Sequence, residues 1–323
     1  MRYQSIEKLL NTYWYSFSDE PLAVRGNYLP RLCDPVYLLP EESPDGAWHL
    51  FAHSILGLEH FVSTSGLEWK REKILFYRGH SPFIYKEGST YYLLFEIHDK
   101  LMFSKNKDKK KDSRIMMCSS SDLYLWSEPK MIIDSTLLPL AKYKEGAVRV
   151  SRPQLVSIDG GYRLYFGSGE IKIYDSNQKT TARLMYAQSQ FIDGPYEVVQ
   201  NPIMGVEPDS EYRNLAVGAV HIIPCSDGFA AIECAYYFDQ NKNKSTSAML
   251  LLYSNDGIKW KLSRAIQRPS EEGWASRYIT SADLRYKEDE DSWYCYYSAN
   301  GYAKFLGMRY VKEGLGLLLG KDD

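Results

Sequence analysis

Short apolar runs separated by polar turns recur along the whole sequence, and this pattern predicts β-strands. Residues 91–95 and 162–166 are two examples, because each is rich in Tyr, Leu and Phe and follows a Glu-Gly or Asp-Gly turn. Aromatic and branched runs of this length, bounded by such turns, are typical of strands joined as hairpins. No run comes near the roughly 18 apolar residues of a membrane-spanning helix, so no membrane span is predicted.

The strands are grouped in a unit that is repeated five times. The units begin near Asp34, Ser81, Arg152, Gly218 and Ala282, and each contains several short strands joined by turns. A repeated unit of four short antiparallel strands is the sequence signature of a propeller blade. The sequence therefore predicts an all-β protein, a five-bladed β-propeller with four-stranded blades. We expect residues 1–323 to form one domain, since propellers of this length commonly do.

Both ends of the chain depart from the repeat. Residues 1–29 are predicted to be irregular or helical, because Ile6 and Leu9 can line one helix face after Ser5 as its cap. The same segment could instead cover a blade or help to close the ring. At the other end, residues 314–319 are predicted to form an outer strand.

Composition agrees with a globular protein that binds neither nucleic acid nor a membrane. The net charge is −2, the pI is about 6.3 and aromatic residues make up 14% of the chain. A nearly neutral chain gives no reason to expect a polyanionic partner. The Lys-rich run at residues 105–112 is predicted to be a solvated loop, and the amino terminus leads into no apolar signal segment.

The cysteines indicate where the protein resides. There are five, at positions with no close metal-type spacing: Cys33, Cys118, Cys225, Cys234 and Cys295. We expect buried, reduced thiols in a cytoplasmic protein. The alternative is a single disulfide between Cys225 and Cys234 in an exported protein.

Propeller geometry indicates which residues could form a binding site. The inner strand of each blade begins at one mouth of the central channel, and the antiparallel second strand ends at that same mouth. The polar residues at these positions are Asp34, His53, His80, Ser81, Glu96, His98, Arg152, Glu170, Glu233, Asp283 and Asn300. Concave polar mouths of this kind are the default ligand site.

Several short motifs carry a resemblance to a known group of enzymes. The Cys-Asp-Pro-Val-Tyr start at residues 33–37, the strand at 91–95 and the Ser-x-Asp-x-x-x-Trp corners that end at Trp126 and Trp260 resemble the five-bladed glycosidases. The similarity is to glycoside hydrolase families 43 and 32 and covers about residues 30–310. It implies a five-bladed fold and activity on glycosidic bonds.

The resemblance also implies catalytic roles. In those families an Asp on the first blade is base or nucleophile, which matches Asp34, and a later Glu is the acid. The positions where a further carboxylate is expected read Arg152-Pro153 and Gly218-Ala219, so the acid must come from elsewhere or be absent. We favour Glu170, beside the open Gly-Ser-Gly segment, with Glu96 as the second choice. Such chemistry needs two carboxyl groups across the bond, one with a raised pKa.

The remaining mouth residues are predicted to bind substrate. Arg152 suits a carboxylate or a phosphate, and we therefore expect an anionic group on the ligand. The residues expected to line and orient the substrate are Arg152, His53, His80, Ser81, His98, Glu233, Asp283 and Asn300.

Structural roles compete with these functional ones. Asp34 could cap a turn before Pro35, and Glu96 and Glu170 could be paired with Arg149 or Arg152. No metal or cofactor is predicted. His49 and His53 have a His-x-x-x-His spacing, but on a strand the two would stand about 13 Å apart, too far to share one ion.

The sequence thus predicts a glycoside hydrolase-like protein whose partner is an oligosaccharide or a glycoside. Two alternatives share the same mouth. One is a non-catalytic carbohydrate-binding propeller, and the other is a glycoside phosphorylase in which Arg152 holds phosphate. A structural scaffold is the remaining possibility. The sequence does not specify the sugar, the linkage, the stereochemical outcome or the oligomeric state.

Overall fold

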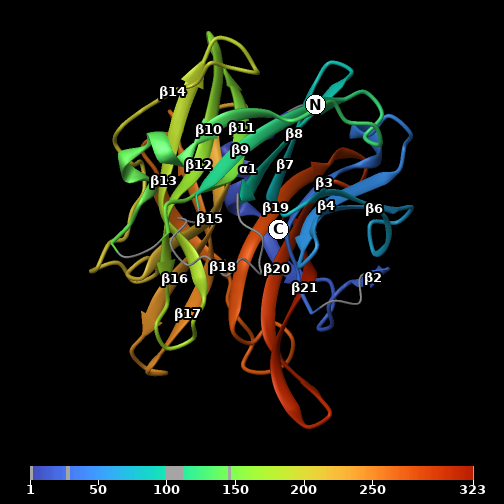
Figure 1. Ribbon diagram of the computed structural model, residues 1–323. Helices are drawn as coiled ribbons and strands as arrows, with labels where there is room; N and C mark the ends of the chain where they lie inside the picture. The colour runs from blue at the N-terminus through green and yellow to red at the C-terminus, as the bar shows by residue number, and fades with distance from the viewer. Residues whose placement is uncertain (1–2, 27–29, 99–111, 145–146, 323) are drawn as a thin grey trace.

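The computed structural model is a β-propeller of five antiparallel blades around a common axis (Figure 1). It describes residues 3–26, 30–98, 112–144 and 147–322. The predicted fold class is therefore confirmed. The inner strands begin two to four residues before the starts taken from the sequence, at residues 32, 79, 150, 216 and 278. Residues 105–111 of the Lys-rich run lie outside the described residues.

The blades follow one another along the chain, each running from the axis outward. Blade one is built from β3 (Leu32–Leu38), β4 (Trp48–Ser54), β5 (Gly57–Ser63) and β6 (Glu68–Tyr77). Blade two contains β7 (Gly79–Glu87), β8 (Thr90–His98), β9 (Ser113–Ser120) and β10 (Lys130–Asp134). Blade three contains β11 (Val150–Ile158), β12 (Gly161–Lys172), β13 (Lys179–Ser189) and β14 (Glu197–Val198).

The last two blades complete the ring. Blade four contains β15 (Ala216–Cys225), β16 (Gly228–Asp239), β17 (Lys244–Ser254) and β18 (Lys261–Gln267). Blade five contains β19 (Tyr278–Lys287), β20 (Ser292–Phe305), β21 (Met308–Lys321) and β1 (Tyr13–Ser16). Short 3-10 turns occur at Pro40–Glu42, Ser135–Leu137, Pro139–Ala141 and Glu288–Glu290.

Blade five is closed by the beginning of the chain. β1 pairs antiparallel with β21, so the outer strand comes from the amino-terminal segment. The expectation for residues 314–319 was wrong, because β20 and β21 form one long hairpin that makes this segment part of the third strand. A few residues later, β2 (Ala23–Arg25) pairs with β6 as a fifth strand of blade one. The amino-terminal segment therefore joins the first and last blades.

The start of the chain also covers blade four. α1 (Ile6–Asn11) is capped by the Ser5 hydroxyl, as the sequence predicts, and it buries Ile6 and Leu9. These two side chains pack with residues of blades four and five, and the Ile6 amide donates to Asp227 at 2.8 Å. The amino-terminal segment therefore has both of the roles considered for it: α1 covers a blade, and β1 helps to close the ring.

Apolar side chains fill the spaces between neighbouring blades. The largest cluster joins blades one, two and three and includes Phe51, Phe95 and Phe166, all fully buried. All five cysteines are buried, and none is bonded to another. α1 is six residues long, and the part of the chain that the structure describes contains no apolar helix of membrane-crossing length.

Candidate functional site

All five inner strands begin with a β-bulge, and in four of them a residue at the bulge has a left-handed backbone conformation. Asp34, Ser81, Arg152 and Gly218 have positive φ angles of 51°, 47°, 51° and 76°. The ladder of each strand shifts register at this point. Left-handed backbone costs a non-glycine residue roughly 1–2 kcal/mol. Strain that recurs at equivalent positions around a channel marks it as a functional feature.

The proline after three of these residues explains why the bulges form. Pro35, Pro82 and Pro153 cannot donate to a sheet ladder, so each is tolerated where the pairing is interrupted. The motif of a polar residue followed by Pro at the start of a repeat is therefore a sequence signal for a side chain at the mouth. Gly218 occupies the equivalent place in blade four and contributes no side chain.

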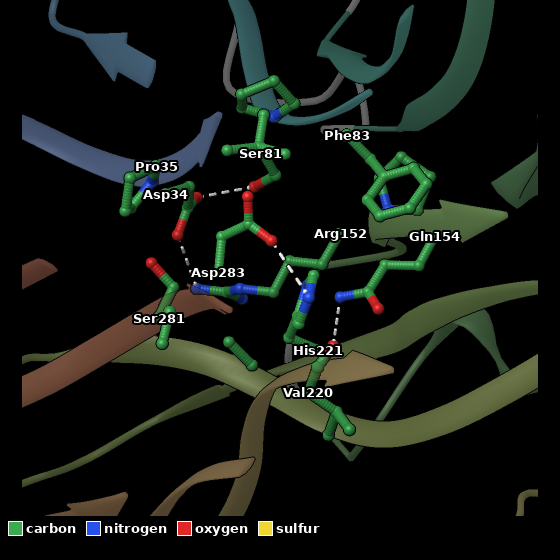
Figure 2. A pocket seen from close by; sticks show the side chains of 15 residues that line it. Asp34, Pro35, Ser81, Phe83, Arg152, Gln154, Val220, His221, Ser281 and Asp283 are labelled. Carbon is green, nitrogen blue, oxygen red and sulfur yellow. Dashed lines mark hydrogen bonds and ion pairs between the residues drawn. The ribbon is translucent and has the colours of Figure 1, made fainter. Parts of the chain in front are cut away.

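The inner strands enclose a narrow cavity of about 30 Å³ on the axis. Figure 2 shows Asp34, Ser81, Arg152 and Asp283 converging on it from four different blades. The sequence reasoning therefore brought together residues that do meet in space, although they are up to 249 positions apart. His221 of blade four lines the cavity as well.

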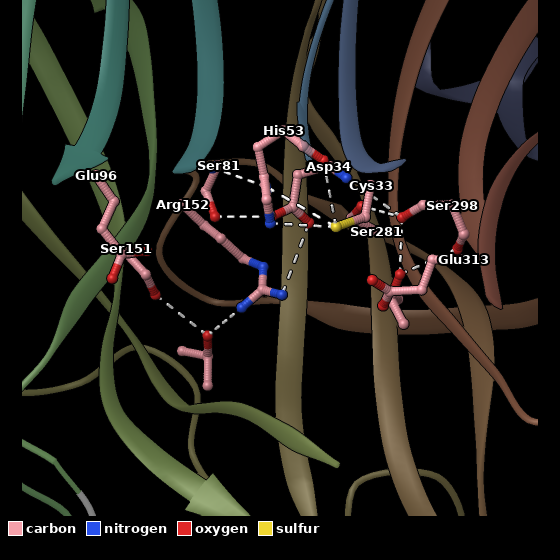
Figure 3. Close-up of polar contacts among 12 residues, drawn as sticks. Cys33, Asp34, His53, Ser81, Glu96, Ser151, Arg152, Ser281, Ser298 and Glu313 are labelled. Atoms are coloured by element: carbon pink, nitrogen blue, oxygen red, sulfur yellow. Dashed lines mark hydrogen bonds and ion pairs between the residues drawn. The ribbon is translucent and has the colours of Figure 1, made fainter. Parts of the chain in front are cut away.

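Asp34 is the carboxylate at the centre of this arrangement (Figure 3). It is 8% exposed and accepts a hydrogen bond of 2.7 Å from the Ser81 hydroxyl. His53 Nδ1 lies 3.2 Å from Asp34 Oδ2, and an Arg152 nitrogen lies 3.7 Å from Oδ1. Burial alone would raise the pKa of Asp34, but Arg152 and His53 hold it well below its usual range. Asp34 is therefore ionised over the whole physiological range.

Arg152 has donor capacity that its neighbours do not use. One terminal nitrogen donates to the Thr181 hydroxyl at 2.7 Å, and another reaches Asp34 only loosely, at 3.7 Å. Its buried Nε has no hydrogen-bond partner within the described structure. A guanidinium with an unused N–H on the wall of a cavity can bind an acceptor of a ligand.

Three imidazoles form a row from Asp34 towards blade two. The ring centres of His53 and His80 are 4.8 Å apart, and those of His80 and His98 are 5.1 Å apart, in edge-to-face contacts. His98 contacts Glu96 at 2.9 Å, so the row connects two carboxylates. Burial and the neighbouring His53 lower the pKa of His80 to about 2, which keeps this ring neutral.

Glu96 and Glu170 share Arg149. Arg149 donates two hydrogen bonds to Glu96, of 2.7 and 2.9 Å, and one of 3.3 Å to Glu170. Lys179 binds the other oxygen of Glu170 at 2.6 Å. Burial would raise the pKa of Glu96, but Arg149 and His98 hold it well below its usual range. The ion pairing considered from the sequence is thus present, with Arg149 as the partner.

Asp283 lies in a second polar network along the axis. Its carboxylate accepts the main-chain N–H of Tyr37 at 2.8 Å and contacts His221 at 2.9 Å and Arg285 at 3.7 Å. Burial would raise its pKa, but His221 and Arg285 lower it. The network joins blades one, four and five, so Asp283 braces the ring as well as lining the cavity.

Seven of the eleven expected mouth residues are not among those that line the cavity: His53, His80, Glu96, His98, Glu170, Glu233 and Asn300. Glu233 is fully buried and is bound by two 2.6 Å hydrogen bonds from Arg213, which follows blade three in the chain. Burial raises the pKa of Glu233. Asn300 is also fully buried, and its amide donates to Gln178 at 3.5 Å. The binding roles of both residues remain predictions.

A metal ion is poorly accommodated at this site. Cys33, Asp34 and His53 offer ligand atoms within 4.8 Å of one another. However, Arg31 donates to the Cys33 sulfur at 3.4 Å and Arg152 lies against Asp34, so a cation would meet two guanidinium groups. Burial also raises the pKa of the Cys33 thiol well above its usual value, which disfavours the thiolate that metals bind.

Sequence reasoning named Arg149 and Arg152 as alternative partners of the two glutamates without deciding between them, and it missed His221. Arg149 precedes the inner strand of blade three, where no motif indicates its direction. His221 could have been found, because it lies three residues after Gly218 on an inner strand. Inner-strand positions shortly after the bulge face the axis, as Asp283 does in blade five, where it lines the same cavity.

Comparisons with known proteins agree with the fold. No protein-family model matches the sequence, and no curated protein sequence matches it. A family 117 glycoside hydrolase from the marine bacterium Zobellia galactanivorans is similar in structure, with a TM-score of 0.61, 12% identity and coverage of 97% of this chain and 91% of that one. The α-L-arabinanase of Cellvibrio cellulosa, in complex with arabinohexaose, has a TM-score of 0.55 at 13% identity and covers 90% and 95%.

A glycosyl hydrolase from Bacteroides ovatus is also similar, with a TM-score of 0.57, 14% identity and coverage of 98% of this chain and 93% of that one. The resemblance to five-bladed glycosidases is confirmed for the fold. Identities of 12–14% support the shared architecture and leave the chemistry to be argued from the site.

Proposed function

We propose that this protein cleaves a glycosidic bond of an oligosaccharide or glycoside bound at the axial cavity, with Asp34 as base or nucleophile. The observation that carries the proposal is the state of Asp34. It is an ionised carboxylate on the cavity wall, held by Ser81, His53 and Arg152. Glycoside hydrolysis needs such a group opposite its proton donor. The fold shared with solved glycoside hydrolases supports the same function.

Glu170 remains the better candidate for the acid. Glu96 is fully buried and receives two hydrogen bonds from Arg149, which hold it ionised. Glu170 has one longer contact with Arg149, and its side chain is 12% exposed. Its other partner, Lys179, is half exposed. Glu170 is therefore the less enclosed of the two candidate acids.

An anionic group on the substrate fits the charge at the mouth. Arg149 and Arg152 both stand beside the carboxylates, and Arg152 retains an unused buried N–H. A carboxylate or phosphate on the ligand would satisfy this donor and balance the charge. Phosphate itself could occupy the same place, in which case the reaction would be phosphorolysis of the glycosidic bond.

One observation favours the non-catalytic alternative. Arg149 neutralises both candidate acids, and a carbohydrate-binding propeller would need neither of them protonated. The two functions differ in what Asp34→Asn does. An enzyme loses turnover and keeps its ligand, whereas a binding protein has no turnover to lose.

The test is turnover of aryl glycosides and glycans by the purified protein, with and without inorganic phosphate. Asp34→Asn should lower turnover of the best substrate by roughly 10³-fold or more, because it removes a group that acts in the reaction itself. Glu170→Gln should lower it more than Glu96→Gln does. Arg152→Ala should raise KM for an anionic substrate and leave a neutral one unaffected.

Asp193→Asn is the matched control, because Asp193 is exposed on blade three and pairs with Lys130 far from the axis. It should behave as the wild type. Full activity of Asp34→Asn, with an unchanged fold by circular dichroism, would refute the role of Asp34. Carbohydrate binding without any turnover, in the wild type and in all variants, would favour the non-catalytic function.

A further inference from the structure

One buried thiol stands beside the candidate site and has no part in the proposed reaction. Cys33 precedes Asp34 on β3 and lies directly opposite His53 of β4 in the ladder. It is 3% exposed and is not among the residues that line the axial cavity. A side chain in this place does not touch a ligand in the cavity, so any influence on the reaction must act through its neighbours.

The sulfur of Cys33, the imidazole of His53 and the carboxylate of Asp34 form a row (Figure 3). Cys33 Sγ lies 3.2 Å from His53 Nε2, and the other ring nitrogen, Nδ1, lies 3.2 Å from Asp34 Oδ2. Successive residues of a strand normally point to opposite faces of the sheet. The bulge with its left-handed backbone at Asp34 explains why both Cys33 and Asp34 reach the same histidine.

The imidazole of His53 carries a single hydrogen. Burial and the charge of Arg31 lower the pKa of His53, so the ring is neutral at physiological pH. A hydrogen on Nδ1 would be donated to Asp34. A hydrogen on Nε2 would point at the sulfur, and Nδ1 would then accept the main-chain N–H of Ser81 at 3.3 Å while its lone pair faced the ionised carboxylate. The charged acceptor therefore favours the hydrogen on Nδ1.

The thiol favours the same arrangement. Arg31 donates to the sulfur at 3.4 Å, so the sulfur already accepts a hydrogen bond. Burial raises the pKa of the Cys33 thiol well above its usual value, so the thiol keeps a hydrogen that needs an acceptor. Within the described residues, His53 Nε2 at 3.2 Å and the His53 carbonyl oxygen at 3.8 Å are in reach. The nearer of the two can accept only when the ring hydrogen is on Nδ1.

We infer that Cys33 is a positioning residue, which donates its thiol hydrogen to Nε2 of His53 and so holds the ring with Nδ1–H aimed at Asp34. This inference rests on the proposed function and adds a residue that orients the group acting in it. The Ser81 hydroxyl donates to the same oxygen of Asp34, Oδ2, at 2.7 Å. Both close partners of this carboxylate are side chains, so its direction depends on how firmly each of them is held.

Two substitutions separate this hydrogen bond from simple packing. Cys33→Ala removes the donor, whereas Cys33→Ser replaces it with a hydroxyl that can donate in the same direction. Cys118→Ala is the matched control, because Cys118 is 2% exposed in blade two and its sulfur contacts the carbonyl oxygen of Leu93. This control removes the same atoms from an equally buried place and leaves His53 and Asp34 untouched.

The first measurement is NMR of the histidine ring nitrogens in the full-length protein, which identifies the nitrogen that carries the hydrogen. The chain has six histidines, and the signals of His53 are those missing from His53→Gln. We expect a hydrogen on Nδ1 that exchanges slowly with solvent in the wild type, Cys33→Ser and Cys118→Ala. In Cys33→Ala its exchange should be faster by roughly tenfold or more, because the ring is then held at one end only.

A hydrogen on Nε2 of His53 in the wild type would overturn the inference, and this result needs no variant of Cys33 to fold. Unchanged exchange in Cys33→Ala with a native circular dichroism spectrum would overturn it as well. Because neither measurement requires turnover, the inference can fail while the proposed function stands, and the reverse.

Kinetics then connects the ring to the reaction. Cys33→Ala should lower kcat by roughly tenfold or more and leave KM within about twofold, because a small misdirection of a reacting group is costly while contacts with the ligand remain. Cys33→Ser should restore at least about half of the wild-type kcat, since it keeps the donor. Cys118→Ala should behave as the wild type. A kcat as low in Cys33→Ser as in Cys33→Ala would assign the loss to packing and contradict the positioning role.

Discussion

Asp34 and Asp283 stand on neighbouring inner strands and line the same cavity, yet their surroundings differ in kind. Asp283 is held by a main-chain N–H, that of Tyr37, and by His221 and Arg285. Asp34 accepts only from side chains, and it occupies a left-handed backbone conformation. One aspartate belongs to the framework of the ring, whereas the other is presented to the cavity.

The difference extends to the arginine beside each carboxylate. Arg285 makes two hydrogen bonds of 2.9 and 3.1 Å to the buried Glu42, so its charge is balanced without any ligand. Arg152 has only a loose contact with a carboxylate, at 3.7 Å from Asp34, although the Nε atoms of both arginines lack a hydrogen-bond partner among the described residues. An arginine that is closely paired with a carboxylate stabilises the fold, and an arginine with a loose partner is available to a substrate.

The largest expected effect comes from neutralising Asp283. Asp283→Asn leaves His221 and Arg285 facing an amide in a fully buried place. Breaking a buried ion pair in this way costs about 3–5 kcal/mol. The free energy of unfolding, measured with denaturant, should fall by this amount. Asp34→Asn should cost less, because Asn tolerates positive φ and still accepts from Ser81. A larger loss in Asp34→Asn than in Asp283→Asn would contradict the division between framework and site.

The second expected effect is a dependence of stability on pH that arises on the Asp34 side. His80 is unprotonated in the folded protein until about pH 2, because of burial and its neighbour His53. In the unfolded chain it binds a proton near pH 6.5. Lowering the pH from 7 to 5 therefore favours the unfolded state, by at most about 1.4 kcal/mol per pH unit from this group.

His80→Gln should remove this part of the slope in denaturant melts at pH 7, 6 and 5. Part of the slope should remain, because burial also lowers the pKa of His60, to about 3. The carboxylates whose pKa is lowered, Asp34 and Asp283, keep their contribution until the pH falls below about 4. An identical slope in His80→Gln and wild type would show that His80 is not shielded from solvent.

The fold was predictable because the repeat appears in local patterns. Strand length, turn residues and the polar start before Pro35, Pro82 and Pro153 all depend on neighbours in the chain. The closing of blade five was not predictable, because β1 and β21 are some 300 residues apart and either could have been the outer edge strand of the blade. Asp34, Ser81 and Arg152 at the mouth were predictable for the same reason as the fold, because a bulge is a local feature.

The sequence could not predict which residues form hydrogen bonds and ion pairs with the residues at the mouth. Arg149 and Glu96 are 53 positions apart in the sequence. Arg149 and Arg152 carry the same charge, and which of them reaches Glu96 depends on the direction of their side chains. Glu233 also illustrates the limit. Its place near a strand end suggested the mouth, but it is paired to Arg213 from a loop with no repeat pattern. Tertiary contacts of long side chains are decided by packing, which no period in the sequence encodes.

The smallest expected effect tests the backbone strain that distinguishes the two regions. Ser81→Ala and Ser81→Gly both remove the hydroxyl bond to Asp34, but only Gly also relieves the left-handed conformation at φ 47°. Ser81→Gly should therefore be more stable than Ser81→Ala by about 0.5–1 kcal/mol, after the greater entropy of unfolded Gly is counted. Ala282, beside Asp283, lies in a regular part of β19. There the sign should be reversed, and Ala282→Gly should destabilise the protein by about 1 kcal/mol in the same denaturant melts. If Gly were worse than Ala at both positions, the bulge at Ser81 would store no strain, and the contrast between the mouth and the framework would rest on side chains alone.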